Sequence, residues 1–448
     1  MTAAPAEPTR TRRASGTYSI ALLVAVVLLQ RFVIPAGGTQ QIALTLPVGI
    51  VILLLGIRAG EFVPRRAQLH CALVIVATAV LCTLVHVVTG GAPSLLSLGL
   101  VVILYAAAAF SADLGPVAVA RVQRVFLRLM SVAAVVSLLQ LGVQYAGVAH
   151  QDWLGTVVPK ALLQAGYNTG DPITYGADLY RSNGVLFLEP SFLSLFLGVA
   201  VAVALHSGAG WKRLTLLLLG IVPTLAGGGL VVIIPAVIAV ALGRHRRKLL
   251  GLLPAAVAAV VAAAVTPFGT QYLARSTEAS NPNTSSSYRL VQPYSSLMPP
   301  SMDTTVHALI GHGAGAADRY LLAVDRADVT VPLVPKVLFE YGLLGLVGIL
   351  LPLVLLLVGG LRFRPWAAGV VLAYLYVNAS FIQSTLVFLT LFWVTLLPPR
   401  DGRAVGRNEA DGQDAPARGS ADRGGAATPV APRKELAGAV GGGRGPGR

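Results

Sequence analysis

Residues 334–359 of the chain, VPKVLFEYGLLGLVGILLPLVLLLVG, decide its fold class. Two charged side chains, Lys336 and Glu340, lie near the start of this stretch, and the run that follows to residue 359 has none. A helix needs about 20 apolar residues to cross the hydrocarbon core of a bilayer, which is about 30 Å thick. The stretch therefore predicts a helix that spans a membrane.

The composition of the whole chain indicates the same class. Of its 448 residues 55% are hydrophobic and 12% are charged, whereas charged residues make up about 25% of an average soluble domain. The apolar residues recur in long runs with almost no charge, and not in the alternation of half-buried helices or strands. We therefore expect an all-α polytopic membrane protein, and we exclude disulfide scaffolds, nucleic-acid readers and cytosolic enzymes.

Scanning the chain for runs of this length predicts about twelve spanning helices. They lie at 18–35, 41–57, 70–89, 94–112, 124–149, 188–206, 213–227, 229–243, 249–267, 334–359, 366–380 and 382–397. The seventh and eighth are short and meet at the glycines 227–229. Basic clusters at 212–213 and 244–248 flank this pair, so an even number of crossings separates them if both clusters face the cytoplasm.

The distribution of charge predicts the orientation of the helices, because Lys and Arg are enriched in cytoplasmic loops. With the N-terminus inside, the cytoplasmic segments before the C-terminal tail hold 17 basic and three acidic residues, and the opposite side holds eight and ten. This asymmetry favours twelve crossings with both termini in the cytoplasm. It also accounts for the net charge of +15 without a nucleic-acid partner.

The chain divides into three parts. Residues 1–17 form a cytoplasmic N-terminal tail, in which three arginines precede a long apolar run without a cleavage site, as in a retained signal-anchor helix. Residues 18–397 form the transmembrane domain. Residues 398–448 are rich in Gly, Ala, Arg, Asp and Pro without hydrophobic periodicity, which predicts a disordered cytoplasmic tail that contacts anionic lipid.

Two predicted extracytoplasmic loops, at about 150–188 and 268–333, are too long to be simple connections. Structureless loops of more than about 15 residues are uncommon in compact domains. Both loops contain aromatic residues, Gly, Pro and paired charges, so we expect ordered caps. Most of the outward-facing ionisable residues lie in these loops, and we therefore expect the functional site to be extracytoplasmic, close to the membrane surface.

The first loop ends in the motif RSNGVLFLEPSF, residues 181–192. Glu189 and Pro190 open the next helix, where proline fits the first turn and a carboxylate is favoured by the helix dipole. The alternative is that Glu189 is a carboxylate held at the mouth of a cavity. An acid at this depth is costly unless it is paired or hydrated, and Arg181 is its obvious partner.

The second loop contains Arg275 and, within SSSYRLVQPY, Arg289. Guanidinium groups bind phosphate oxygens bidentately, so arginines gathered at a membrane surface suit a diphosphate head group; loop salt bridges are the alternative. Further along, HALIGHGAGAADRY contains His307 and His312, and KVLFEYGLLG contains Glu340. The usual metal-binding motifs do not occur in the sequence, and we expect no metal site.

The order of these features resembles the O-antigen ligase and Wzy-type polysaccharide polymerase family, membrane glycosyltransferases that act on lipid-linked glycans. About twelve helices are followed by an Arg…Gly…Glu-Pro stretch at the end of one outer loop, and then by a large outer loop with an arginine. This loop has a Gly-x-Gly (Gly311, Gly313) before a Glu-x-Gly-Leu-Leu-Gly entry into a helix at Glu340. The resemblance covers roughly Arg181 to Leu397.

The resemblance implies transfer of a glycan from an undecaprenyl-diphosphate carrier to an acceptor hydroxyl, with inversion at the anomeric carbon and without a metal or other cofactor. Arg181 and Arg289 would bind the diphosphate and stabilise its charge as it leaves, and Arg275 is a third candidate. The ligase branch commonly has His-Asn about nine residues before the glutamate, where this chain has Val331-Pro332. This departure leaves the general base undefined.

A general base for a sugar hydroxyl is a nearby histidine or carboxylate. The candidates for the catalytic group are His312, Glu189 and Glu340, with His307 as a further possibility for the base. The expected partners are the undecaprenyl-diphosphate-linked glycan, membrane lipids, a flippase and chain-length regulators. The expected location is the cytoplasmic (inner) membrane, with the active site on its outer face.

Three functions are consistent with the sequence. The first is a polymerase that extends a lipid-linked exopolysaccharide, capsule or O-antigen-like glycan. The second is a ligase that moves a finished glycan to a lipid or cell-wall acceptor. The third, from another class, is a flippase or transporter, which needs ionisable groups or broken helices near the bilayer midplane. The predicted spans have almost no such charges, which favours chemistry at the surface.

Overall fold

The computed structural model describes residues 14–36, 41–173, 179–242, 249–250, 252–265, 285–326, 329–377 and 381–397. These residues belong to one compact unit. Arg275 and the predicted tail after residue 397 lie outside the described residues, as do residues 1–13 of the N-terminal tail.

The described chain is mostly helical. The helices in its first half are α1 (Thr17–Leu28), α2 (Thr45–Arg58), α3 (Arg66–Val88), α4 (Leu95–Ala106), α5 (Pro116–Tyr145), α6 (Trp153–Val157) and α7 (Pro190–Ser207). Those that follow are α8 (Trp211–Ile221), α9 (Gly228–Leu242), α10 (Leu253–Val265), α12 (Ser285–Leu290), α13 (Gln292–Ser301), α14 (Thr305–Ile310), α15 (Ala316–Ala323), α16 (Leu333–Gly345), α17 (Leu351–Leu361), α18 (Ala368–Leu372) and α19 (Ser384–Leu391).

Each of the twelve predicted spans overlaps at least one of these helices, and 334–359 overlaps both α16 and α17. Within the described residues, four helical segments are long and apolar enough to cross a membrane: Arg66–Val88, Pro116–Tyr145, Pro190–Ser207 and Leu333–Leu361. Six shorter apolar helices, of 10–17 residues, lie at other predicted spans. Three helices change to π-helical turns, at Leu346–Leu350, Ala373–Val377 and Phe392–Leu396. The chain therefore has the helical character of an integral membrane protein.

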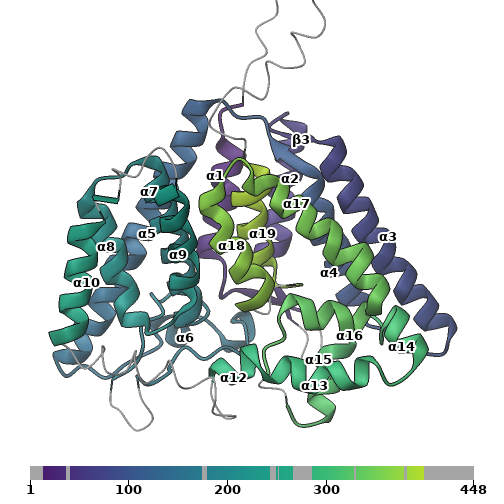
Figure 1. Ribbon diagram of the computed structural model, residues 1–448. Coiled ribbons are helices and arrows are strands. Elements are labelled where there is room, and N and C mark those ends of the chain that lie inside the picture. The colour runs from purple at the N-terminus through teal and green to yellow at the C-terminus, as the bar shows by residue number, and fades with distance from the viewer. Residues whose placement is uncertain are drawn as a thin grey trace, which may run out of the picture. The chain divides into compact units, whose positions relative to one another are not determined.

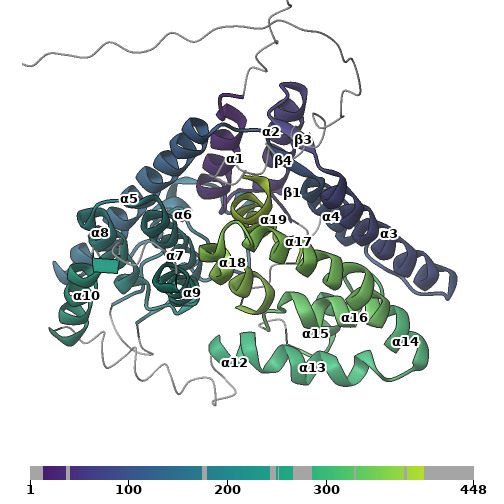
Figure 2. The same ribbon diagram turned by 45° about the horizontal axis from the view of Figure 1, so that its top comes forward.

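Helices from distant parts of the sequence lie side by side. Helices α7 to α10 lie on one side of α18 and α19, and α3 and α4 lie on the other (Figures 1 and 2). Helices α12 to α15 gather at the end where α16 begins (Figure 1). The predicted second cap is thus helical over its described residues. It has a small apolar core of its own, which includes Leu297, Leu321 and Phe339.

Small residues allow the central helices to approach closely, as is common between membrane helices. A Cβ atom at Gly198 of α7 would lie 2.6 Å from the carbonyl oxygen of Gly229 in α9, so only glycine fits there. Beside this contact, the hydroxyl of Ser194 donates to the carbonyl oxygen of Ala226 (2.7 Å) and accepts from the N–H of Gly229 (3.0 Å). These contacts fix the turn between α8 and α9 against α7.

Two buried charged side chains, Glu61 and Arg364, cap helix ends far from the second cap. The carboxylate of Glu61 accepts from the backbone N–H and the hydroxyl of Ser19, both at 2.7 Å, and so caps the start of α1. Arg364 donates to the carbonyl oxygens of Trp393 (2.9 Å) and Val394 (3.2 Å), at the end of the segment that begins with α19. A carboxylate at a helix N-terminus and a cation at a C-terminus are both favoured by the helix dipole.

Two short antiparallel strand pairs lie among the first helices. Strands β1 (Val33–Pro35) and β2 (Gln41–Ala43) pair with Val33 opposite Ala43. Strands β3 (Phe62–Pro64) and β4 (Phe110–Ala112) pair with Phe62 opposite Ala112. The β1–β2 hairpin lies between α1 and α2, at the end of α1 opposite to Glu61.

An ion pair fixes the first long loop next to the β1–β2 hairpin. Arg31 donates from Nη1 to Oδ1 of Asp152 (2.7 Å) and to the carbonyl oxygen of Val185 (2.9 Å). Burial raises the pKa of Asp152, but the hydrogen bonds and charge of Arg31 outweigh it and hold this pKa below its usual value. The loop is thus ordered at both of its ends, as the sequence predicts for a cap.

Candidate active site

A cavity of about 370 Å³ lies where the β1–β2 hairpin, the first long loop and the second cap meet. Cavities of roughly 300–1,000 Å³ are of the size that holds a small polar ligand. The polar residues that line it are Gln41, Gln164, Tyr167, Glu189, Arg289, Asp318, Thr330, Lys336, Gln383 and Ser384. Two cations and two acids are therefore gathered here from four separate segments.

Four helices begin beside this cavity. The lining residues Leu46, Phe192, Lys336 and Ser384 belong to the first residues of α2, α7, α16 and α19. A helix N-terminus carries roughly half a positive charge and free N–H groups, and it favours anions. The four N-termini and two cationic side chains make this the place where the described structure is best suited to bind an anion.

Glu189 and Arg289 form an ion pair inside the cavity. Nη2 of Arg289 lies 2.8 Å from Oε2 of Glu189, which also accepts from the hydroxyl of Ser191 (3.0 Å). Glu189 directly precedes α7, and its side chain does not cap the N-terminal backbone N–H groups of this helix. Of the two sequence-based alternatives for Glu189, the geometry favours a carboxylate that faces a cavity.

Lys336 is the second cation of the cavity, and it bridges two acids. Its Nζ lies 2.6 Å from Oδ2 of Asp318 and 3.2 Å from Oε1 of Glu340. The side chains of Lys336 and Glu340 are 5% and 1% exposed, so this pair is buried, whereas Asp318 is 60% exposed. Asp318 can therefore move away from Lys336 at little cost, but Glu340 cannot.

Two glycine motifs that are separate in the sequence interlock next to Glu340. Gly311 (φ +74°) and Gly342 (φ +61°) both have left-handed backbones, and a Cβ atom at Gly342 would lie 2.5 Å from the carbonyl carbon of Leu309. The N–H groups of His312 and Gly313 donate to the carbonyl oxygens of Phe339 and Glu340, both at 2.9 Å. The GHGAG stretch, residues 311–315, therefore holds the kink of α16 at Gly342 through backbone hydrogen bonds, and we call this contact the backbone clamp.

Arg181 occupies a different place from Arg289. It forms an ion pair with Asp171 and is buried, and it is not among the described residues that line the cavity. The residues after Arg181 are bonded to α5: Gln140 accepts from the hydroxyl of Ser182 (2.6 Å) and from the N–H of Gly184 (2.8 Å). Most of the RSNG motif thus fastens the first loop to a helix.

His312 and His307 also lie apart from the cavity. Neither is among its described lining residues, and their rings pack against each other with centroids 3.9 Å apart. His312 also stacks on Phe339, with a centroid distance of 4.4 Å. Of the catalytic and diphosphate-binding candidates, the structure brings Glu189, Arg289 and Glu340 to the cavity or to a residue that lines it.

Sequence reasoning did not select Lys336, Asp318 or Tyr167. Lys336 and Glu340 are four residues apart on one helix, and this spacing is the signal that could have paired them. Asp318 is next to Arg319 in the sequence, but its carboxylate contacts Lys336 instead. Burial raises the pKa of Tyr167 to about 12, so its hydroxyl stays protonated and can donate a hydrogen bond in the cavity.

The comparisons with known proteins identify the family. A search of curated proteins finds no match to the chain. A family model described as WcaD colanic acid polymerase matches residues 18–396, which include all the described helices. The chain therefore belongs to the WcaD colanic acid polymerase family, and it is a membrane glycosyltransferase of the polysaccharide polymerase type.

Proposed function

We propose that this protein joins lipid-linked oligosaccharide repeat units into a polysaccharide, and that the reaction takes place in the cavity between Arg289 and Lys336. The observation that carries the proposal is the convergence of these two cations and four helix N-termini on one cavity of about 370 Å³. The family supports polymerisation of lipid-linked units. The leaving group of such a unit is a diphosphate, which this cavity is suited to bind.

The ion pairs in the cavity suggest how the substrate binds. In the structure Arg289 is held by Glu189 and Lys336 by Asp318. A diphosphate that enters would exchange with these carboxylates, bind both cations and leave Glu189 free. Arg289 and Lys336 would then stabilise the charge that develops on the diphosphate as the glycosidic bond breaks.

Glu189 is our choice for the general base. Once Arg289 binds the diphosphate, the carboxylate of Glu189 can accept the proton of the acceptor hydroxyl, whose oxygen attacks the anomeric carbon. A direct attack inverts the configuration of this carbon, and the two cations supply the charge stabilisation without a metal ion. Glu340 positions Lys336 through their ion pair, and Arg181 positions the first loop through its ion pair with Asp171.

We place the cavity on the outer face of the cytoplasmic membrane, with twelve crossings and both termini inside. Two facts support this placement: the basic residues concentrate on the predicted cytoplasmic side, and the lining segments come from predicted extracytoplasmic loops and helix ends. The domain boundaries are then 1–17, 18–397 and 398–448. The substrate would be an undecaprenyl-diphosphate-linked glycan, delivered by a flippase and extended under chain-length regulators.

The two other functions have less support. A ligase would use the same cavity, but the chain has Val331-Pro332 where ligases commonly have His-Asn. A flippase needs a polar path through the bundle, whereas α7 is buried along almost its whole length, mostly by apolar residues, from Phe192 to Leu205. Both observations favour a polymerase.

The test is a polymerisation assay with the purified full-length protein in detergent. A synthetic undecaprenyl-diphosphate oligosaccharide is supplied, and product length is followed on a gel. Arg289→Ala should lower the rate of elongation by about 10²–10³-fold, which is the usual effect of removing one group that stabilises a developing anion. The control is Arg319→Ala, an exposed arginine of the same cap that is absent from the described cavity lining.

Several outcomes would contradict the proposal. Elongation unchanged by Arg289→Ala would remove the diphosphate site from this cavity. Transfer of a single finished glycan to another acceptor, without elongation, would identify a ligase. Movement of the substrate across the liposome membrane, without any change in the length of its glycan, would identify a flippase.

A further inference from the structure

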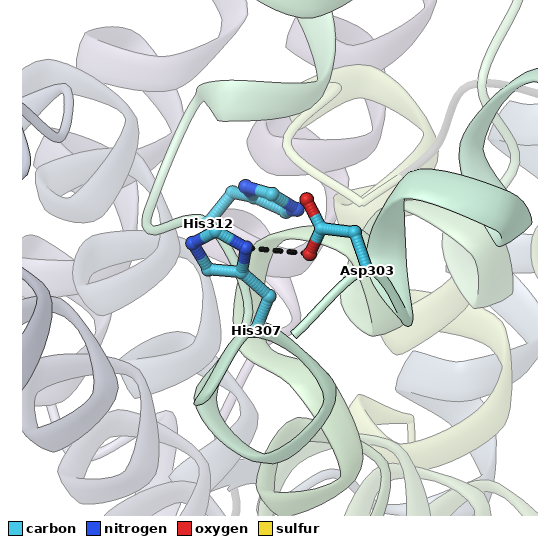
Figure 3. A group of neighbouring side chains, drawn as sticks. All are labelled: Asp303, His307 and His312. Carbon is cyan, nitrogen blue, oxygen red and sulfur yellow. Dashed lines mark hydrogen bonds and ion pairs between the residues drawn. The ribbon is translucent and has the colours of Figure 1, made fainter. Parts of the chain in front are cut away.

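A second cluster of ionisable side chains lies outside the cavity. Asp303, His307 and His312 meet at the turn between α13 and α14 and at the loop that follows α14, and their side chains face one another (Figure 3). One carboxylate oxygen and one ring nitrogen from each histidine all lie within 4.8 Å of one another. Nδ1 of His307 lies 2.7 Å from Oδ1 of Asp303. None of the three is among the described residues that line the cavity.

The donors and their spacing fit a metal ion. Zinc binds histidine nitrogen and carboxylate oxygen at roughly 2.0–2.2 Å, which places tetrahedral donors about 3.3–3.6 Å apart. The separations here, from 2.7 Å to at most 4.8 Å, bracket this range, and rotation of the two stacked imidazole rings would bring all three donors onto one ion. Imidazole and carboxylate together suit zinc, copper, nickel and related ions better than magnesium or calcium.

The ring of His312 is already oriented by its other contacts. Its Nε2 lies 2.9 Å from the carbonyl oxygen of Pro300, which can only accept, so the ring donates from this nitrogen. Metal-binding histidines typically use their second nitrogen in this way, and the bond fixes their tautomer. One face of the ring is packed against Phe339 at 4.4 Å.

The cluster is open to solvent on one side. The side chains of His307 and Asp303 are 29% and 47% exposed. An ion can therefore enter without opening the cap, and water can complete its coordination.

We propose that Asp303, His307 and His312 bind one divalent transition-metal ion of the zinc class. The ion ties the end of α13 and the helix α14 to the loop at 311–313, whose backbone N–H groups clamp the kink of α16 beside Glu340. Its role is to stiffen this part of the second cap. The proposal is independent of the reaction in the cavity, since it concerns other residues and is tested by binding alone.

The test uses the full-length protein purified with a tag that contains no histidine and then treated with a chelator. Co²⁺ is titrated into the protein, because its visible absorption reports the coordination number, and bound metal is measured by mass spectrometry. We expect one Co²⁺ per chain, displaced by Zn²⁺. His307→Gln and Asp303→Asn should each weaken binding by at least about tenfold. His150→Gln is the control, since His150 contacts Thr169 and Tyr180 instead.

Thermal unfolding gives a second measurement. An ion that binds only the folded state raises the unfolding midpoint, so Zn²⁺ should raise it for the wild type and for His150→Gln but not for His307→Gln. The proposal is overturned if the wild type binds no Co²⁺ in a saturable way. It is equally overturned if His307→Gln binds Co²⁺ as tightly as His150→Gln, or gains as much stability from Zn²⁺.

Discussion

Glu61, beside the start of α1, and Glu340, in the middle of α16, are both buried carboxylates, yet they are neutralised in different ways. Glu61 accepts hydrogen bonds from the backbone and hydroxyl of Ser19, and at the same end Arg364 donates to backbone carbonyl oxygens. Glu340 instead faces the side chain of Lys336, which also contacts Asp318. Near Glu61 the charged side chains are bound by helix termini. Near Glu340 they are bound by side chains of opposite charge, among them Asp318 from a separate helix.

The difference separates structural charges from exchangeable ones. A backbone partner is fixed once the helix has formed, so it cannot be given up to a ligand without unfolding a turn. A side-chain partner such as Asp318 or Glu189 can swing away when a stronger anion arrives. We therefore expect substitutions at Glu61 to change stability alone, and substitutions around Lys336 to change both stability and polymerisation.

The largest effect is expected from Lys336→Met. This change leaves the carboxylate of Glu340 buried without its cation, which typically costs about 3–5 kcal/mol, and it removes one of the two cavity cations. Elongation should fall by about 100-fold or more. The double variant Lys336→Met with Glu340→Gln should regain most of the stability but none of the activity. Thermal unfolding and the gel assay measure the two effects, and recovery of elongation in the double variant would rule out a role for Lys336 in substrate binding.

The next effect is expected from Gly342→Ala in the backbone clamp. The left-handed conformation alone costs a non-glycine residue about 1–2 kcal/mol, and the new Cβ would also clash with Leu309 at 2.5 Å. We expect a loss of at least 2 kcal/mol, seen as a lower unfolding midpoint. Gly359→Ala in α17 is the matched control, because nothing lies within 4 Å of its Cβ; there alanine should be neutral or stabilising by about 1 kcal/mol. Equal midpoints for the two variants would contradict the interlock.

A smaller effect is expected from Glu61→Gln at the opposite end. The amide keeps the shape of the side chain but loses the charge that favours the start of α1, so stability should fall by about 1 kcal/mol. Elongation measured well below the unfolding midpoint should equal that of the wild type. A specific loss of elongation without a loss of stability would abolish the distinction between the two ends.

The smallest effect concerns pH and the ion pair of Arg31 with Asp152. Because the pKa of Asp152 is lower in the folded protein, the pair contributes its full stability above the unfolded pKa of about 3.9, and loses it as the pH falls through the folded pKa. Asp152 is 30% exposed, so we expect no more than about 1 kcal/mol. Unfolding midpoints between pH 6 and pH 3 should fall less for Asp152→Asn than for the wild type. Parallel curves would mean that Asp152 does not contribute.

The helices could be predicted from the sequence because apolar runs of membrane length leave few alternatives. All twelve predicted spans overlap a helix, including the short pair at the glycines 227–229. Their lengths could not be predicted, since α8 ends at Ile221 and α1 at Leu28, short of the apolar runs that contain them. Hydropathy reports which residues avoid water, and not where a helix turns into a loop.

The candidate site could be predicted only in part from the sequence. Glu189 was selected because of its place before Pro190, and Arg289 because of its charge in a cap. Lys336 was overlooked although its i,i+4 spacing from Glu340 is a local signal, and its second partner, Asp318, comes from another helix, a long-range pairing that leaves no local pattern. The proposed metal ligands Asp303, His307 and His312 were overlooked because they match none of the usual metal-binding motifs, although Asp303 and His307 have the i,i+4 spacing of helical neighbours.

The contact between Gly311 and Gly342 has a consequence for exchanging parts between related polymerases. The backbone around Gly311 contacts the backbone around Gly342, and hydrogen bonds join the two stretches. The segment between them therefore begins and ends at the same place in the fold. If the boundary of a graft falls inside residues 311–342, a loop from one protein meets the α16 kink of the other. The contacts between the two backbones would then not match. A chimera that is intended to alter the glycan product should therefore exchange residues 311–342 as one unit.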